Sequence, residues 1–335
     1  MGSIEPAFLS GAPVYIGVDL GGSNISGMAF AWQGERYHCV ATEKIDTEAK
    51  EGYDHVIVRI RSVIAELVGS TNKQNLRPVA VGLCAPGVVT ADGRVRVAPN
   101  LGWKNVTPLR DLDLTALGIS EGEIFLLNDV NAGLMGELTA LKPVPPITVA
   151  YFCGTGIGGA VAINGQLLTG AHGGAGEVGH MVVRAGGRKS DGVHGSLEAY
   201  IGKWAINRRI ERELERNRKT IFRKLIKYNL KKTPIKSSTL KKAYLSKDSF
   251  ARDLLEAYYA RYLGIAISQV ANLLEPHLVV LGGGIMEALG TELIPHIEDH
   301  LAKHALTTPP ELRLATLGDS AGPLGAAHYA RLSVG

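Results

Sequence analysis

Two stretches of the sequence follow the same pattern of strand, glycine turn and strand. The first reads VYIGVD from Val14, breaks at Gly21-Gly22-Ser23-Asn24, and continues as ISGMAFA. The second reads ITVAYFC at 147–153, breaks at Gly154 to Gly159, and continues as AVAING at 160–165. Alternating apolar runs around glycine-rich breaks are typical of strand pairs. Their repetition predicts two related halves that face each other across a cleft.

The length of 335 residues exceeds the usual size of one compact core and also favours two lobes. A proline-rich stretch at 143–146 is the expected boundary. We therefore expect an N-terminal tail at 1–13, a first lobe at 14–142 and a second lobe at 143–335.

Residue periodicity predicts the other elements of both lobes. Strands are expected at 37–43, 79–84, 124–128 and 277–284. Helices are expected at 53–68, about 130–141, about 197–228, 249–275, near 287–304, and from Pro323 onward.

Composition excludes several classes of protein. With 45% hydrophobic and 20% charged residues, the chain is typical of globular proteins, and a net charge of +4 gives no general case for nucleic acid. Three distant cysteines suggest no disulfide framework, and the N-terminus does not resemble a signal peptide, so we expect a cytoplasmic protein. The longest uncharged stretch, 143–176, is too rich in glycine for a membrane span, so no membrane partner is expected.

The first glycine break follows a carboxylate, Asp19, and offers the amides of Gly21, Gly22, Ser23 and Asn24. Small residues let a backbone approach phosphate closely, and Asp19 would hold Mg²⁺ directly or through water. Taken alone, the segment equally fits an ordinary hairpin turn.

The second break, Gly154-Thr155-Gly156, begins a match to G-x-G-x-x-G. A dinucleotide site would require a helix to follow, whereas AVAING is a strand, so only a phosphate-binding hairpin remains. Gly283 and Gly284 follow a buried strand, where a bare backbone would accept a flat adenine ring; a tight turn is the alternative.

Asn128-Asp129 ends a strand and begins a helix, so Asp129 fits two roles, which can coexist in one residue: a helix N-cap, and the base that removes a proton from a sugar hydroxyl. The glycine-rich segment 173–180 carries a carboxylate and an imidazole three residues apart. Polar groups suited to a sugar are Asn100, Glu177, His180 and Glu198. His180 alone would more often be a structural histidine.

In this order, the segments resemble those of the ROK sugar kinases, from Val14 to Ala330. They are IGVDLGGSN, LCAPGVV, VRVAPNLGWKNV, LLNDVNAGLMGE, CGTGIGGAVAINGQLLTG, GAHGGAGEVGHM, LVVLGGGI and LGDSAGPLGAA. The resemblance implies an α/β fold of the two-lobed actin-like ATPase (ribonuclease H-like) class.

The resemblance also implies roles for the residues above. Asp129 would be the general base and Asp19 part of the Mg²⁺ and phosphate site. Sugar ligands would be Asn100, Asn128, Asp129, Glu177, His180 and Glu198, and ATP would be bound by the two phosphate loops with Gly283 and Gly284. A homodimer or homotetramer is also implied.

One departure from the family pattern lies at 189–198. Many members carry three cysteines there that bind a structural zinc with the preceding histidine. This chain has Lys189-Ser190-Asp191-Gly192-Val193-His194-Gly195-Ser196-Leu197-Glu198, without cysteine, so we predict no such zinc.

A second departure is a basic segment at about 205–248. Between Asn207 and Lys247 fifteen Lys or Arg accompany three acidic residues, a net of 15 − 3 = +12. Such helices usually present a solvated face; a surface that gathers anionic substrate, or polyphosphate as donor, is the alternative.

Glucose and ATP are therefore the expected substrates, with Mg²⁺ as the cofactor. Fructose, mannose, N-acetylglucosamine and N-acetylmannosamine are alternative acceptors, and polyphosphate is an alternative donor. A sugar-responsive repressor would need a helix-turn-helix domain, for which the 13 residues before Val14 leave no room. A catalytically inactive sugar-binding protein is disfavoured by Asp19 and Asp129.

Overall fold

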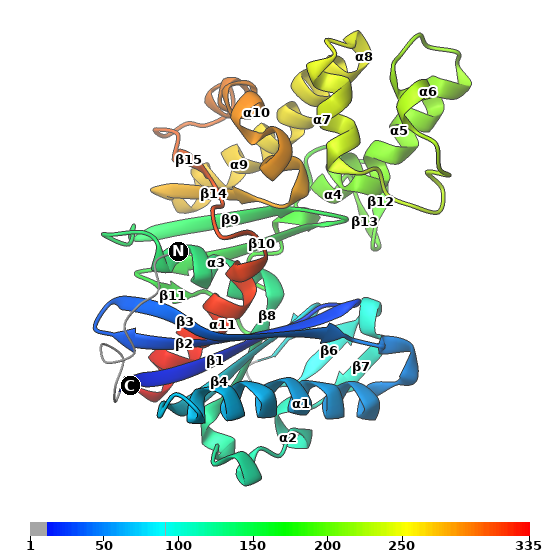
Figure 1. The fold of residues 1–335 in the computed structure, drawn as a ribbon. Coiled ribbons are helices and arrows are strands. Elements are labelled where there is room, and N and C mark those ends of the chain that lie inside the picture. Colours follow the sequence, from blue (N-terminus) through cyan, green and yellow to red (C-terminus); the bar gives the residue numbers. More distant parts are fainter. Residues whose placement is uncertain (1–11, 91) are drawn as a thin grey trace. The chain divides into compact units, whose positions relative to one another are not determined.

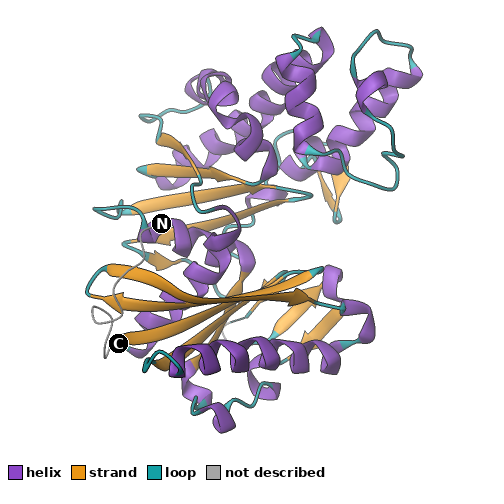
Figure 2. Cartoon of the chain, viewed as in Figure 1, coloured by secondary structure: helices purple, strands orange, loops and turns teal. Residues whose placement is uncertain are grey.

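The computed structural model describes residues 12–90 and 92–335, and it forms two compact units (Figures 1 and 2). Unit 1 contains the described residues up to Val144, together with 169–175 and 319–335. Unit 2 contains 145–168 and 176–318. The first crossing lies within two residues of the boundary expected from the prolines.

Unit 1 is built on a five-stranded mixed sheet in the order β3-β2-β1-β4-β8. Its strands are β1 (Pro13–Leu20), β2 (Asn24–Gln33), β3 (Arg36–Asp46), β4 (Arg77–Ala85) and β8 (Ile124–Asn128). β1 runs antiparallel to β2 and parallel to β4, which in turn is parallel to β8. Because parallel strands end at the same edge, the register pairs Asp19 with Cys84 and Ala85 with Asn128.

Helices cover both faces of this sheet. The apolar stripe of α1 (Tyr53–Asn72) packs on one face, where Val63 and Leu67 meet Gly27. On the other face lies α11 (Ala321–Val334), whose backbone touches the sheet so closely that a Cβ at Gly17 would lie 1.7 Å from the Pro323 oxygen. α3 (Asp129–Thr139) packs against α11.

The C-terminal helix therefore belongs to unit 1, whereas the sequence pattern predicted a second lobe that continues to residue 335. The reason is backbone packing. A Cβ at Gly82 would lie 1.9 Å from the Ala326 oxygen, and one at Gly325 would lie 1.7 Å from the Ala132 oxygen. Glycines on the sheet, on α3 and on α11 thus permit a contact that any side chain would prevent.

Smaller elements complete unit 1. They are β5 (Val88–Val89), β6 (Val95–Ala98) and β7 (Trp103–Val106), which form a three-stranded sheet, and α2 (Pro108–Asp111).

Unit 2 repeats the sheet of unit 1 in the order β11-β10-β9-β14-β15. Its strands are β9 (Ile147–Cys153), β10 (Ile157–Ile163), β11 (Gln166–Leu167), β14 (Leu278–Gly282) and β15 (Glu311–Leu314). β9 is antiparallel to β10 and parallel to β14. The predicted repeat is thus confirmed: in both units the first strand lies at the centre, between its hairpin partner and the fourth strand.

Helices form most of the remainder of unit 2. They are α4 (Leu197–Ile201), α5 (Lys203–Glu215), α6 (Phe222–Leu225), α7 (Ser237–Leu245), α8 (Ser249–Arg252), a π-helical stretch at Asp253–Tyr259, α9 (Ala260–Leu274) and α10 (Gly284–Ala302). The large buried side chains Tyr151, Phe222, Phe250 and Tyr259 contribute to their common core. A two-stranded hairpin, β12 (Lys189–Ser190) and β13 (Val193–His194), precedes α4.

The long helix predicted at about 197–228 is wrong. α4 ends before Gly202, which has extended backbone angles, and α5 ends before Asn217, whose φ of 59° lies in the left-handed region. No helix in the described part of the chain is long and apolar enough to cross a bilayer.

Candidate active site

The first glycine turn, between β1 and β2, is closed by hydrogen bonds to uncharged groups. The Gly21 amide donates to the Asn24 carbonyl at 2.9 Å, and the Thr47 hydroxyl donates to the Gly21 carbonyl at 2.6 Å. The Thr47 amide also donates to the Ser23 carbonyl at 2.8 Å. Gly22 is exposed, and a Cβ there would lie 3.2 Å from the Asn100 carbonyl oxygen. The turn is therefore rigid, open to a ligand and adjacent to Asn100.

Asp19 lies at the end of β1 among other acidic groups of unit 1. The Cys84 thiol donates to Asp19 Oδ1 at 3.3 Å. Burial raises the pKa of Asp19, the Cys84 hydrogen bond opposes this rise, and the charge of Asp319 adds to it. A Cβ at Gly322 would lie 3.0 Å from the Asp19 carboxyl carbon, so the first turn of α11 lies against this carboxylate.

Asp129 is the first residue of α3, but the N-cap is its neighbour. Asn128 Oδ1 accepts hydrogen bonds from the amides of Val130 and Asn131 at 2.8 and 3.2 Å, and Asn128 Nδ2 donates to the Gly87 carbonyl at 2.8 Å. One of the two roles that the sequence left open for Asp129 is therefore taken by Asn128.

The Asp129 carboxyl has a pKa raised to about 6, chiefly by burial and next by the negative charge of Asp19. Oδ1 accepts from the Val130 amide at 2.9 Å, which opposes the rise. A carboxylate with a pKa near neutrality suits proton abstraction better than an ordinary aspartate does.

The second glycine turn, between β9 and β10, is closed with the help of a carboxylate. The Gly154 amide donates to the Gly156 carbonyl at 2.9 Å, and the Ile157 amide donates to Glu198 Oε2 at 2.9 Å. A Cβ at Gly156 would lie 2.2 Å from this oxygen. The Lys203 amide donates to the Thr155 carbonyl at 3.1 Å, which ties the turn to the start of α5.

Glu198 is also bonded to the cysteine-free segment at 189–198. The Ser190 hydroxyl donates to Glu198 Oε1 at 2.8 Å from the β12–β13 hairpin. The Gly195 amide donates to the Arg188 carbonyl at 2.7 Å, and the Arg188 guanidinium donates to the Tyr258 hydroxyl at 3.3 Å. Hydrogen bonds therefore hold this segment and orient Glu198.

Glu177 and His180 lie on one turn, with His180 Nε2 4.0 Å from Glu177 Oε2. His180 Nδ1 is buried and has no hydrogen-bond partner among the described residues. A buried polar atom without a partner is costly in a finished structure, and it is a candidate for a bond to a ligand.

The Gly283-Gly284 turn lies next to the second glycine turn because β14 is parallel to β9. Gly282 pairs with Phe152, and a Cβ at Gly283 would lie 2.6 Å from the Cys153 carbonyl oxygen. Gly283 also has a φ of 84°, which disfavours any other residue. Unit 2 thus brings the expected phosphate loop and adenosine turn together at one sheet edge.

Sequence reasoning missed the groups that support these sites: Thr47, Cys84, Ser190, Lys203 and Asp319. Cys84, Ser190 and Asp319 lay in recognised segments, but only the carboxyl of Asp319 offered a chemical signal. The others act through contacts that no local pattern encodes.

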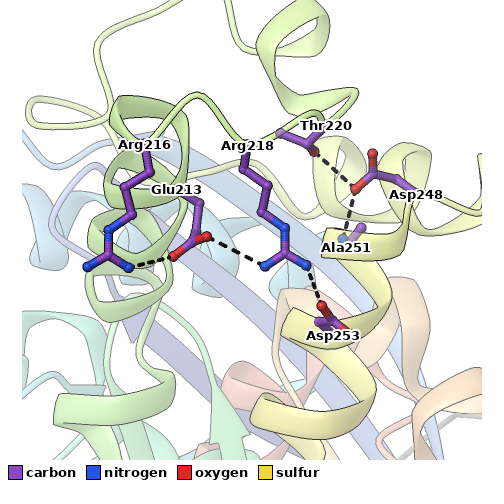
Figure 3. A network of polar contacts seen from close by, with 7 residues as sticks. All are labelled: Glu213, Arg216, Arg218, Thr220, Asp248, Ala251 and Asp253. Carbon is purple, nitrogen blue, oxygen red and sulfur yellow. Dashed lines mark hydrogen bonds and ion pairs between the residues drawn. The ribbon is translucent and has the colours of Figure 1, made fainter.

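The basic segment is partly paired within unit 2 (Figure 3). Glu213 contacts Arg216 and Arg218, and Arg218 also contacts Asp253. Asp248 accepts from the Thr220 hydroxyl at 3.0 Å and from the Ala251 amide at 2.9 Å, capping α8. The lysines of 219–247 are exposed, and none of them forms an ion pair with an acid in the described chain.

Comparison with known proteins shows which family and which relatives the chain is similar to. The model of the ROK family matches residues 15–332. A glucokinase of Halalkalibacterium halodurans is 31% identical over 324 residues, which cover 93% of each chain.

Two solved structures are also similar. The ROK hexokinase from Thermus thermophilus has a TM-score of 0.77 and 28% identity over 96% of this chain and 99% of that one. A ROK family glucokinase from Streptomyces griseus, in complex with glucose and AMPPNP, has a TM-score of 0.75 and 25% identity over 95% and 99%. With the two matching sheets, these likenesses confirm the expected α/β fold of the actin-like class.

Proposed function

Because the chain belongs to the ROK family and is a glucokinase-like sugar kinase, we propose that it transfers the γ-phosphoryl group of ATP to the 6-hydroxyl of glucose. We further propose Asp129 as the general base. The observation that carries this role is the Asp129 carboxylate, which Asn128 relieves of helix capping and whose pKa is raised to about 6.

In the proposed reaction, the Asp129 carboxylate accepts the proton of the sugar hydroxyl as its oxygen bonds to the γ-phosphorus. The bond from that phosphorus to the bridging oxygen breaks, and ADP leaves with the electron pair. The amides of the turns Gly21-Gly22-Ser23-Asn24 and Gly154-Thr155-Gly156 would bind phosphate oxygens. Gly283 and Gly284 would lie along the adenosine.

Mg²⁺ would reach this site with the nucleotide and supply neutralisation of phosphate charge. The described residues contain no cluster of three His, Cys, Asp or Glu suited to a metal ion. Mg²⁺ usually takes one or two carboxylates and completes its shell with phosphate oxygens and water. Asp19 would hold the ion directly or through water, and a cation there would relieve the repulsion that Asp19 and Asp129 exert on each other.

Sugar hydroxyls would be bound by Asn100, Asn128, Asp129, Glu177, His180 and Glu198. Each Glu198 oxygen accepts one hydrogen bond from the protein, which leaves capacity for a second from a sugar hydroxyl. His180 Nδ1 offers an unpaired atom.

We propose glucose ahead of other acceptors because the similar proteins above include glucokinases. Fructose, mannose, N-acetylglucosamine and N-acetylmannosamine are the alternatives, since few contacts separate such substrates. Polyphosphate is the alternative donor, suggested by the exposed lysines of the basic segment. A cytoplasmic homodimer or homotetramer is the proposed working state.

A panel of these sugars with Mg-ATP, read by coupled release of ADP, tests the proposal. We expect the highest kcat/KM with glucose. Another sugar preferred by tenfold would replace glucose as the substrate, and no turnover with any sugar would overturn the kinase proposal. Turnover of glucose with polyphosphate, in the absence of ATP, decides the donor.

A further inference from the structure

Lys203 joins two parts of the proposed nucleotide site. It is the first residue of α5, and its amide donates to the Thr155 carbonyl at 3.1 Å. The backbone of Lys203 therefore belongs to the support of the second glycine turn.

The side chain of Lys203 extends to the Gly283-Gly284 turn. A Cβ at Gly284 would lie 3.4 Å from Lys203 Nζ and 2.9 Å from Ser237 Oγ. Lys203, Ser237 and Gly284 are the first residues of α5, α7 and α10 (Figure 1). Three helices from distant parts of the chain thus begin around one ammonium group.

Positive charge at this point is uncompensated. None of the three helices has a side-chain hydrogen bond capping its first turn, and the free amides of a helix N-terminus carry positive partial charge. Lys203 is half-buried, and it forms no ion pair within the described residues. An ammonium group beside three helix N-termini favours the binding of an anion.

We propose that Lys203 binds the phosphate chain of the nucleotide and, through Thr155, holds the second glycine turn in place. The anion is a nucleoside diphosphate or triphosphate, because Lys203 lies between the expected phosphate loop and the expected adenosine turn. A sugar is uncharged and would not neutralise the ammonium group of Lys203. This inference rests on the proposed kinase function and adds a residue to its donor site.

Calorimetric titration of the free protein with adenosine, Mg-ADP and Mg-AMPPNP tests the inference without turnover. Replacing Lys203 with Met keeps most of the side-chain volume and removes the charge. We expect about tenfold weaker binding of Mg-ADP and Mg-AMPPNP, because the variant loses one charge-assisted hydrogen bond to phosphate. The affinity for adenosine is expected to stay unchanged. Lys203→Arg is expected to restore most of the affinity.

Lys242→Met is the matched control, since Lys242 is an exposed lysine of α7 that contacts neither turn. Equal affinities of the wild-type and Lys203→Met proteins for Mg-ADP would overturn the role of Lys203 and leave the kinase function standing. Loss of adenosine binding in proportion to Mg-ADP binding would also overturn it, because that result indicates a structural role. Failure of the wild-type protein to bind any nucleotide would overturn both proposals.

Discussion

The two glycine turns both join a pair of strands, but different chemical groups hold them in place. The turn of unit 1 is held by the Thr47 hydroxyl and by main-chain amides. The turn of unit 2 is held by the Glu198 carboxylate, which the Ser190 hydroxyl orients. One repeat unit has therefore acquired two different kinds of support.

The carboxylates of the two units also differ in their surroundings and hydrogen bonds. In unit 1, Asp19 and Asp129 are partly buried, and each has a raised pKa. In unit 2, both oxygens of Glu198 accept hydrogen bonds. We propose that the carboxylates of unit 1 serve a metal ion and a proton, whereas the carboxylate of unit 2 shapes the backbone that would receive phosphate.

The largest effect is expected from Asp129→Asn. The change removes the proposed base and keeps the shape of the side chain, so we expect kcat to fall by about 10²–10⁴-fold with little change in the KM for glucose. Steady-state kinetics with coupled ADP release measure this fall. Wild-type turnover in this variant would exclude Asp129 as the base.

The same variant also tests the electrostatic part of the comparison. Because burial and Asp19 raise the Asp129 pKa from 3.8 to about 6, ionisation of this carboxyl costs folding stability; the cost grows as the pH rises from about 4 to about 6 and is constant above that. The neutral amide removes this penalty, so the Tm of Asp129→Asn is expected to exceed that of the wild type at pH 8, and the difference is expected to shrink as the pH falls from about 6 to below about 4. A lower Tm at pH 8 would contradict the proposed strain.

Gly156→Ala is expected to disrupt the turn of unit 2. The new methyl group would lie 2.2 Å from Glu198 Oε2, so the carboxylate must move and release the Ile157 amide. We expect the KM for ATP to rise about tenfold or more, which corresponds to the loss of a hydrogen bond to a charged group.

Gly174→Ala is the matched control for that change, since a Cβ at Gly174 would meet nothing within 4 Å. Kinetics of the two variants side by side separate the Glu198 contact from a general effect of replacing glycine. Equal KM values for ATP in the two variants would show that the Glu198 carboxylate moves without affecting the turn.

The sequence predicted those strands that depend only on neighbouring residues. β8 and β9 have the predicted bounds, because short apolar runs between turn residues are read from neighbouring residues alone. The supports of the turns were not predictable in the same way. Thr47 and Glu198 reach their partners from 26 and 41 residues away, and no spacing rule connects them to a glycine turn.

Two further features depended on three-dimensional packing. The return of α11 to the sheet of unit 1 requires Gly17 and Gly82, whose importance appears only once Pro323 and Ala326 lie against them. The identity of the N-cap of α3 was visible only in the structure, because both asparagine and aspartate are good N-caps and their preferences do not distinguish Asn128 from Asp129.

The pH profile provides a smaller test. If Asp129 must be ionised to accept a proton, kcat/KM for glucose, which reports the pKa of the enzyme without bound sugar, is expected to be constant well above pH 6 and to fall about tenfold per pH unit below it. The raised pKa places this fall near pH 6, about two units above that of an ordinary aspartate. Stopped assays from pH 5 to pH 8 with glucose below its KM measure it, and a constant kcat/KM down to pH 5 would contradict the raised pKa.

The smallest effects are expected from removing the two hydroxyl groups that support the turns. Thr47→Val leaves the Gly21 carbonyl without the 2.6 Å donor that the fully buried Thr47 provides, whereas Ser190→Ala frees one oxygen of a Glu198 carboxylate that water partly reaches. We expect Thr47→Val to lower the free energy of unfolding by about 1–3 kcal/mol, and Ser190→Ala by about 1 kcal/mol or less.

A kinetic effect is expected from Ser190→Ala, which alters the support of the turn in unit 2. Ser190→Ala lets Glu198 reorient, so we expect a twofold to fivefold rise, on the order of 0.5–1 kcal/mol, in the KM for both glucose and ATP. Denaturant titrations and steady-state kinetics of both variants measure these changes. If Ser190→Ala proves the more destabilising of the two, the charged support of unit 2 depends on its hydroxyl more than the neutral support of unit 1 does, and the contrast between the turns is reversed.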